Sequence, residues 1–187
     1  MDTIHGKNKT NVSKKIAILG AESTGKTELS VQLAKHYHTI CVPEYARQYF
    51  DVHDINHYTI ADLDLIAKNQ IQLENELLSK ADRLLICDTT LITIKIWSVY
   101  QFNKISEFIS SSIHSTDYDL YLICNNDVEW TEDPQRRNPE LRDHLLKWNM
   151  HELTKLNVDY HIIEGSGEEK LKNAIRIIDE QFPKLTS

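Results

Sequence analysis

The stretch Ile16-Ala17-Ile18-Leu19-Gly20-Ala21-Glu22-Ser23-Thr24-Gly25-Lys26-Thr27 decides the fold of this chain. A short apolar run leads into the spacing Gly-x4-Gly-Lys-Thr, and an amphipathic segment follows. This is the phosphate-binding P-loop pattern in the strand–loop–helix order that it requires. Backbone N–H groups of such a loop point inward at phosphate oxygens, and the next helix directs its positive N-terminal end at the same anion. The stretch therefore predicts a site for a nucleoside triphosphate.

Lys26 and Thr27 distinguish a phosphate-binding loop from an ordinary turn. A turn between a strand and a helix would explain the two glycines, but not the lysine and hydroxyl that follow them. Lysine reaches the outer phosphates as a point charge, and a threonine hydroxyl is a ligand for Mg²⁺. We therefore expect ATP to contact the loop through Gly20, Glu22, Ser23, Thr24, Gly25, Lys26 and Thr27.

The composition is that of one ordinary globular domain. The chain has 187 residues, of which 26% are charged and 41% hydrophobic, and its formal net charge is −7. This acidic balance disfavours a nucleic-acid partner, which needs a basic face. No apolar run approaches the roughly 18 residues of a membrane span, and the polar N-terminus lacks the apolar centre of a signal peptide. We expect a flexible tail at residues 1–14, a single domain over 15–187, no membrane partner and a cytoplasmic location; the oligomeric state stays open.

The three cysteines indicate neither a disulfide framework nor a zinc site. Cys41, Cys87 and Cys124 each lie within or at the end of a short β-like apolar run. Their odd number and their spacing do not match a set of paired or metal-binding cysteines. We expect buried free thiols in a sheet, with a reactive cysteine as the alternative.

Apolar runs alternate with amphipathic segments along the chain. The apolar runs predict five short strands, at about residues 15–19, 39–42, 83–87, 118–124 and 158–163. Three helix starts carry signals, which are a capping box from Thr59 to Asp62, the pair Asn138-Pro139, and a second capping box from Ser166 to Glu169. This order predicts a three-layer α/β fold of the P-loop NTPase type, in which helices flank a five-stranded parallel sheet.

Charged residues follow two of these strands. Ligands of an open α/β sheet bind outside the carboxyl ends of its strands, and Glu44 and Arg47 lie at such an end, one helical turn apart. We favour a substrate-binding role for both over a surface ion pair. Asp88 ends an aliphatic run, which after a P-loop is the Walker-B arrangement. We expect Asp88 to hold Mg²⁺ together with Thr27.

Two helices carry further candidates. Gln70 and Glu74 fall on or beside the apolar stripe of the helix that runs from Thr59 to about Lys80, and polar residues on a buried face need partners. They point into a site or form hydrogen bonds within the core, and we retain Gln70 as a substrate-binding candidate. Trp97, in the helix over residues 91–102, belongs to the core or lines a pocket for a flat ring.

The segment after the fourth strand predicts a lid. Residues 127–139 are dense in charge and contain Pro134 and Pro139, which favours a mobile loop over regular structure. Its arginines suit a triphosphate because the planar guanidinium meets phosphate oxygens in pairs. Arg136, Arg137 and Arg142 are candidates to close on the phosphates, although for Arg137 alone we favour a solvated loop residue.

Five motifs in order resemble one family. They are Gly20–Thr27, Pro43-Glu44-Tyr45-Ala46-Arg47, Asp88-Thr89, Lys95-Ile96-Trp97-Ser98 and Trp130-x2-Asp133-x2-Arg136. The ordered set is similar to the kinase domain of NadR-type NAD-biosynthesis proteins, the ribosylnicotinamide kinases, over about residues 15–178. The resemblance implies a nucleoside-kinase-like fold with the P-loop strand at the centre of the sheet. It also implies phosphorylation of nicotinamide riboside to nicotinamide mononucleotide by ATP and Mg²⁺.

The chemistry of the residues singled out above fits the reaction that the resemblance implies. Phosphoryl transfer needs positioning and charge neutralisation more than covalent chemistry. Glu44 would hold the hydroxyls of the acceptor and accept the proton of the attacking one, and Arg136, assisted by Arg142, would stabilise the transferring group. We expect the catalytic residues to be Lys26, Glu44, Asp88 and Arg136, and the acceptor contacts to be Glu44, Tyr45, Arg47, Gln70 and Trp97. Trp97 or Tyr45 would stack on the nicotinamide ring.

Some features limit this inference. The bifunctional relatives also carry a nucleotidyltransferase domain and sometimes a DNA-binding domain, for which we expect no room here, so only kinase activity is inferred. Position 90 is a threonine where we expect a second acidic residue in the family, which leaves Asp88 as the only carboxylate at its strand end. A kinase for another nucleoside or hydroxylated acceptor, or a regulatory ATPase module, would use the same frame. A GTPase is disfavoured because Asn125-Asn126-Asp127 lacks the lysine of the guanine-reading motif.

Overall fold

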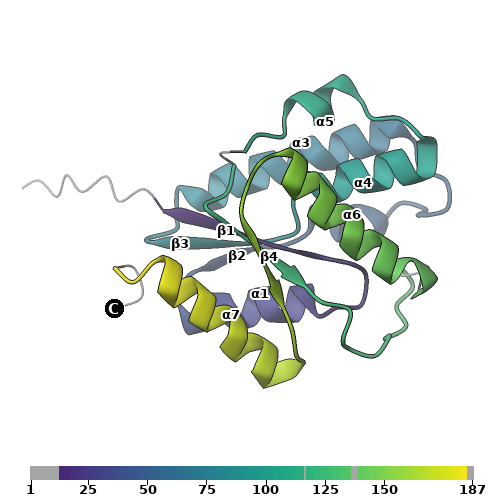
Figure 1. Ribbon diagram of the computed structural model, residues 1–187. Helices are drawn as coiled ribbons and strands as arrows, with labels where there is room; N and C mark the ends of the chain where they lie inside the picture. Colours follow the sequence, from purple (N-terminus) through teal and green to yellow (C-terminus); the bar gives the residue numbers. More distant parts are fainter. Residues whose placement is uncertain (1–12, 116, 136–138, 185–187) are drawn as a thin grey trace, which may run out of the picture.

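Five parallel strands form the central sheet in the order β2-β3-β1-β4-β5 (Figure 1). The structure is a computed structural model that describes residues 13–115, 117–135 and 139–184. The predicted P-loop NTPase fold is confirmed, with the P-loop strand at the centre of the sheet. The strands are β1 (Lys14–Gly20), β2 (Ile40–Val42), β3 (Leu84–Asp88), β4 (Leu120–Cys124) and β5 (Tyr160–Ile163).

Helices cover both faces of the sheet (Figure 1). One face carries α1 (Lys26–His36) and α7 (Gly167–Gln181). The opposite face carries α3 (Ile60–Leu78), α4 (Leu91–Phe102) and α6 (Arg142–Lys155). Shorter elements are α2 (Tyr45–Phe50), α5 (Glu107–Ser111) and the 3-10 turn η1 (Pro139–Leu141).

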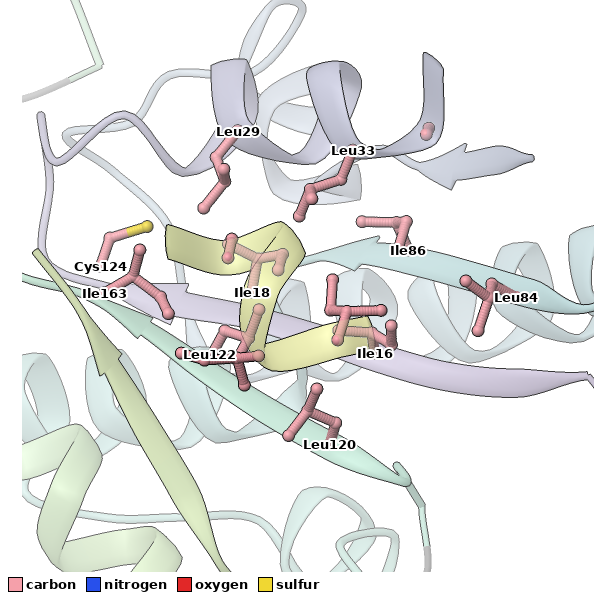
Figure 2. Packing of buried hydrophobic residues seen from close by; sticks show 14 residues of the cluster. Ile16, Ile18, Leu29, Leu33, Leu84, Ile86, Leu120, Leu122, Cys124 and Ile163 are labelled. Carbon is pink, nitrogen blue, oxygen red and sulfur yellow. The ribbon is translucent and has the colours of Figure 1, made fainter. Parts of the chain in front are cut away.

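Alternate residues of β1 pack against opposite helical layers. Ile16 and Ile18 join a cluster with α1 and α7 that includes Leu29 and Leu33 (Figure 2). The residues between them, Ala17 and Leu19, pack against α4 and α6 instead. All four β1 side chains are fully buried, which is why this strand has a continuous apolar sequence rather than an alternating one. The P-loop therefore starts from a central strand that is covered by helices on both faces.

The predicted helix starts have different outcomes. The capping box from Thr59 to Asp62 is confirmed at the start of α3. The second capping box is wrong, since Ser166 makes no side-chain cap and Gly167 begins α7 with φ +51°. The helix predicted to begin at Asn138-Pro139 starts later, because Pro139 opens the 3-10 turn and α6 begins at Arg142. Asn138 itself lies outside the described residues.

Other predictions concern the cysteines, the tail and the membrane. The three cysteines are free thiols as predicted, with Cys87 and Cys124 buried and Cys41 half-buried. Residues 1–12 of the predicted tail lie outside the described residues, and β1 begins within the remainder, at Lys14. Within the described chain, no helix has the length and apolar character needed to cross a membrane.

Candidate active site

Strand register brings three sequence motifs to one edge of the sheet. In the pairing of β1 with β3, Asp88 lies opposite Ile18, two residues before the first glycine of the P-loop. In the pairing of β2 with β3, Val42 lies opposite Cys87, so the chain leaves β2 toward Glu44 beside the Asp88 end of β3. The P-loop, Glu44 and Asp88 therefore meet at the carboxyl edge, where open α/β sheets bind ligands.

The P-loop has the backbone that its glycines predict. Gly20 and Gly25 have φ values of +142° and +80°, and Ser23 also lies in the left-handed region at +56°. A Cβ on Gly20 would lie 2.9 Å from the carbonyl oxygen of Cys124, whereas a Cβ on Gly25 would have no neighbouring atom within 4 Å. Gly20 therefore permits close packing against β4, and Gly25 faces open space above the loop.

Side chains of the loop hold its shape from within. The Thr24 hydroxyl and the Lys26 ammonium both donate to the Ala21 carbonyl, at 2.9 and 2.6 Å. Lys170, from α7, is buried and donates to the Thr24 carbonyl at 2.9 Å. Its ammonium also lies 3.5 Å from the Asp127 carboxylate. The loop is thus fixed both from inside and from the helix behind it.

A cavity of about 880 Å³ joins the P-loop to an aromatic region. All of the P-loop residues predicted to contact ATP line it, and so do Glu44, Arg47 and Trp97. Its far end is formed by α2, the connector after it, and α4, with the aromatic side chains Phe50, Tyr58, Trp97 and Tyr100. One end suits phosphates, and the other suits a flat apolar ring.

Glu44 and Arg47 line the same cavity as the P-loop. Arg47 Nε lies 3.6 Å from the Glu44 carboxylate, and Arg47 Nη1 donates to Asp133 at 3.1 Å. Burial raises the pKa of Glu44 above its ordinary value, and the Asp88 charge adds to this shift, although the Lys26 charge opposes it. A carboxylate in this environment accepts a proton more readily than an exposed one.

Asp88 is suited to bind a cation. Its side chain is 1% exposed, and neither carboxylate oxygen accepts a hydrogen bond from the residues that the structure describes. Burial raises the pKa of Asp88, while the Thr27 hydroxyl and the Lys26 charge act to lower it. The hydroxyl faces the carboxylate without the geometry of a formed hydrogen bond. Unpaired carboxylate oxygens next to a hydroxyl are the ligand types that Mg²⁺ prefers, so the residues fit this ion.

Two acceptor-site candidates lie behind the cavity. Gln70 is 1% exposed, and its amide oxygen accepts a hydrogen bond from the Tyr45 backbone N–H at 2.8 Å. The Tyr45 side chain packs among the apolar residues between α2 and α3. Neither Gln70 nor Tyr45 lines the cavity. Of the two aromatic residues predicted to stack on the ring, Trp97 lines the cavity and Tyr45 does not.

The described part of the predicted lid contacts both the P-loop and α2. The Thr131 N–H donates to the Ser23 hydroxyl at 2.7 Å. Further along, Asp133 accepts from Arg47, and the Gln135 amide donates to Asp51 at 2.9 Å. The segment therefore bridges the P-loop and α2 and contributes to the lining of the cavity.

The three arginines predicted to close on the phosphates differ in outcome. Arg136 and Arg137 lie outside the described residues. Arg142 is placed against the base of the P-loop, where its guanidinium donates to the backbone carbonyls of Val128 and Ser23 at 2.8 and 3.3 Å. Arg142 thus joins the lid segment to the P-loop backbone.

Sequence reasoning missed two buried polar residues of the site. Lys170 lies on the buried face of α7, together with Ala174, Ile177 and Ile178. Asn149 is 3% exposed, lines the cavity, and lies one turn after Leu145 on the buried face of α6. Its amide nitrogen donates to the Leu145 carbonyl, and its oxygen accepts from none of the described residues. In both cases the signal was a polar residue in helical register with an apolar stripe.

Comparisons with known proteins agree with this geometry. A family model described as an AAA domain matches residues 15–170. The trifunctional NAD biosynthesis/regulator protein NadR of Salmonella typhimurium is 24% identical over 173 residues, which are 89% of this chain and 42% of the relative. The NadR protein of Escherichia coli is 28% identical over 124 residues, 65% of this chain and 30% of the relative. The chain spans less than half the length of these curated relatives.

Solved structures show the same fold. A crystal structure of NadR in complex with NAD and AMP-PNP superposes with a TM-score of 0.76 at 20% identity, covering 91% of this chain and 50% of that one. A NadR structure in complex with NR matches with the same TM-score. Thymidylate kinase from Ehrlichia chaffeensis has a TM-score of 0.63 at 15% identity, covering 90% of this chain and 98% of that one. The fold is that of P-loop nucleoside and nucleotide kinases.

Proposed function

The chain belongs to the AAA domain family, and on that basis we propose that it is a kinase that uses Mg-ATP to phosphorylate nicotinamide riboside to nicotinamide mononucleotide. One observation carries the proposal. A single cavity is lined by the P-loop, by the Glu44 carboxylate and by aromatic side chains. These are the components that transfer from a triphosphate to a nucleoside hydroxyl requires. The homology to NadR supports nicotinamide riboside as the acceptor.

The residues at the phosphate end bind and orient the triphosphate. The P-loop N–H groups and the Lys26 ammonium would contact the phosphates, with Lys26 exchanging its present contact to Ala21 for a phosphate oxygen. Asp88 and Thr27 would hold Mg²⁺, which when bound neutralises the charge that develops on the phosphates. Most of the catalytic effect would therefore come from positioning and electrostatics.

Glu44 prepares the acceptor. Its raised pKa suits a carboxylate that orients the attacking hydroxyl and takes up its proton during transfer. Trp97 lines the cavity and would stack on the flat ring of the acceptor. The lid segment, which contacts Ser23 and Arg47, would exclude water that competes as an acceptor.

A coupled ADP-release assay tests the proposal. Mg-ATP is offered with nicotinamide riboside, adenosine, uridine, thymidine or shikimate, with a Lys26→Ala variant as the inactive control. We expect turnover with nicotinamide riboside alone, and loss of that turnover in Lys26→Ala. Turnover confined to another acceptor would contradict the proposed substrate, and nucleotide binding without release of ADP for any acceptor would favour a regulatory ATPase module.

The role of Trp97 has a matched control on α6. Trp97→Leu is expected to raise KM for nicotinamide riboside by about 2- to 12-fold, since stacking of an aromatic ring is worth about 0.5–1.5 kcal/mol and 1.4 kcal/mol is a factor of ten. Trp148→Leu removes another half-buried tryptophan, which packs against His144 and does not line the cavity. Its KM should stay within about twofold of the wild-type value. Equal effects of the two substitutions would exclude a stacking role for Trp97.

A further inference from the structure

Glu44 occupies the N-cap position of α2 but does not cap the helix. Its backbone is extended, with φ −67° and ψ 108°, and its side chain makes no capping hydrogen bond. The first N–H groups of a helix have no partner within the helix, and the N-cap side chain usually satisfies one of them. The Glu44 carboxylate instead faces Arg47, at 3.6 Å. The N–H of Tyr45, the first residue of α2, also has no partner within the helix and needs another group to accept from it.

That group is the side-chain amide of Gln70, which comes from α3. Its oxygen accepts from the N–H of Tyr45, the first residue of α2, at 2.8 Å. Its nitrogen lies 3.5 Å from the Pro43 carbonyl, on the other side of Glu44. A backbone N–H can only donate and a carbonyl can only accept, so the amide orientation is fixed by its two backbone partners. Gln70 thus contacts the chain on both sides of Glu44.

A buried ion pair supports Gln70 from behind. One turn later on α3, Glu74 lies 2.7 Å from the Lys15 ammonium and accepts a hydrogen bond from Tyr118 at 2.8 Å. Burial raises the pKa of Tyr118 well above its ordinary value, and the Glu74 charge adds to this, so the phenol stays a hydrogen-bond donor. The Gln70 nitrogen also lies 3.5 Å from this carboxylate. The Glu74 carboxylate oxygen, as a hydrogen-bond acceptor, therefore favours the same amide orientation that the backbone requires.

We propose that Gln70 is a positioning residue for the reaction. By binding the backbone on both sides of Glu44, it fixes the direction in which the Glu44 carboxylate enters the cavity, and the Lys15–Glu74 pair holds Gln70 in that orientation. This inference rests on the proposed function of Glu44 as the group that orients the acceptor. It also explains why the chain has a buried glutamine at a position where the apolar stripe of α3 calls for a hydrophobic residue.

Gln70→Met tests the inference, because methionine keeps the volume and removes both hydrogen-bonding groups. The control is Gln72→Met, on the exposed face of the same helix, where the amide contacts only Glu76 among the described residues. Hydrogen exchange of the Tyr45 amide should become faster in Gln70→Met and stay unchanged in Gln72→Met. With Mg-ATP and nicotinamide riboside, kcat of Gln70→Met should fall about 10- to 100-fold, the cost of a small misplacement of a reacting group. KM for ATP should stay within about twofold.

A double-mutant cycle separates positioning from general destabilisation. If Gln70 acts through Glu44, then Gln70→Met should lower kcat no further in a Glu44→Gln background. A full additional loss there, or an unchanged kcat in the single variant, would overturn the inference. If the wild type phosphorylates none of the acceptors, the proposed function fails. Independently of activity, an unchanged rate of hydrogen exchange at the Tyr45 amide in Gln70→Met would refute the contact between Gln70 and the start of α2. Gln70→Asn, which shortens the reach of the amide, serves as a second variant if Gln70→Met does not fold.

Discussion

Gly25→Ala should separate ligand binding from folding. Gly25 has φ +80° and ψ +18° at the start of α1, and an added Cβ would meet no atom within 4 Å. The only cost to the fold is then the left-handed backbone, about 1–2 kcal/mol for a residue with a side chain. In a protein of this size, each kcal/mol lowers Tm by about 2–4 °C. We expect a folded variant whose Tm is about 2–8 °C lower.

The same Cβ would project into the open space above the loop, where the P-loop would cradle phosphate. We therefore expect the affinity of Gly25→Ala for AMP-PNP to fall at least about tenfold, since a blocked backbone contact with a charged group costs about 1.5–3 kcal/mol. Gly20→Ala is the comparison, because its Cβ would lie 2.9 Å from the Cys124 carbonyl and 3.0 Å from the Thr24 hydroxyl. Overpacking adds about 1–3 kcal/mol to the backbone cost there.

Thermal unfolding by circular dichroism and calorimetric titration with AMP-PNP measure the two effects. Gly20→Ala should lose more stability than Gly25→Ala, whereas Gly25→Ala should lose binding while remaining folded. The reasoning is refuted if Gly25→Ala binds AMP-PNP as the wild type does. It is equally refuted if Gly25→Ala is destabilised as strongly as Gly20→Ala, because the open space above Gly25 would then play no part.

Three further predictions concern carboxylates of the site. The pKa of Glu44 is raised, so kcat should fall as the pH is lowered through that raised value. Glu44→Gln should lose most of the turnover, and its remaining kcat should no longer fall in this acidic range. A wild-type pH profile in the variant would exclude Glu44 as the group that takes up the proton. The folded-state pKa of Asp88 is raised above its unfolded value, so its ionisation destabilises the fold as the pH rises through that range. Asp88→Asn should therefore raise Tm in EDTA at pH 7, but not at a pH below the pKa of an aspartate in the unfolded chain. The same variant should lose Mg-dependent turnover. A lower Tm of Asp88→Asn at pH 7 would contradict this prediction. Asp133→Asn weakens the contact of the lid with Arg47, so limited proteolysis within residues 127–139 should accelerate while Tm changes little, because the pair is partly exposed. Unchanged cleavage would mean that this contact does not hold the lid.

The features that sequence reasoning predicted depend on local pattern. The P-loop and the aliphatic run before Asp88 are short segments whose residue spacing reflects their own local geometry. The parallel pairing of β1 with β3 then brings both to one edge of the sheet. The location of Glu44 at the same edge could be predicted because Glu44 comes directly after a strand. The second capping box failed for a local reason that the pattern did not contain, because Gly167 enters α7 with φ +51°.

The features that it could not predict depend on contacts between distant segments. Gln70 was correctly marked as a polar residue on a buried face, but its partners lie 25 and 27 residues earlier in the chain. The sequence alone could not decide between a ligand and the backbone around Glu44 as its partner. Lys170 contacts a P-loop carbonyl 146 residues away, which no pattern within α7 reveals.

The most direct test of the account is ³¹P nuclear magnetic resonance of the reaction mixture. The purified chain is incubated with Mg-ATP and nicotinamide riboside, with Lys26→Ala in a parallel sample. The account predicts equal growth of the resonances of ADP and of a 5′-phosphomonoester that coincides with added nicotinamide mononucleotide, and no change in the variant. ADP accompanied by inorganic phosphate alone would contradict phosphoryl transfer to the nucleoside, and so would an identical spectrum from Lys26→Ala.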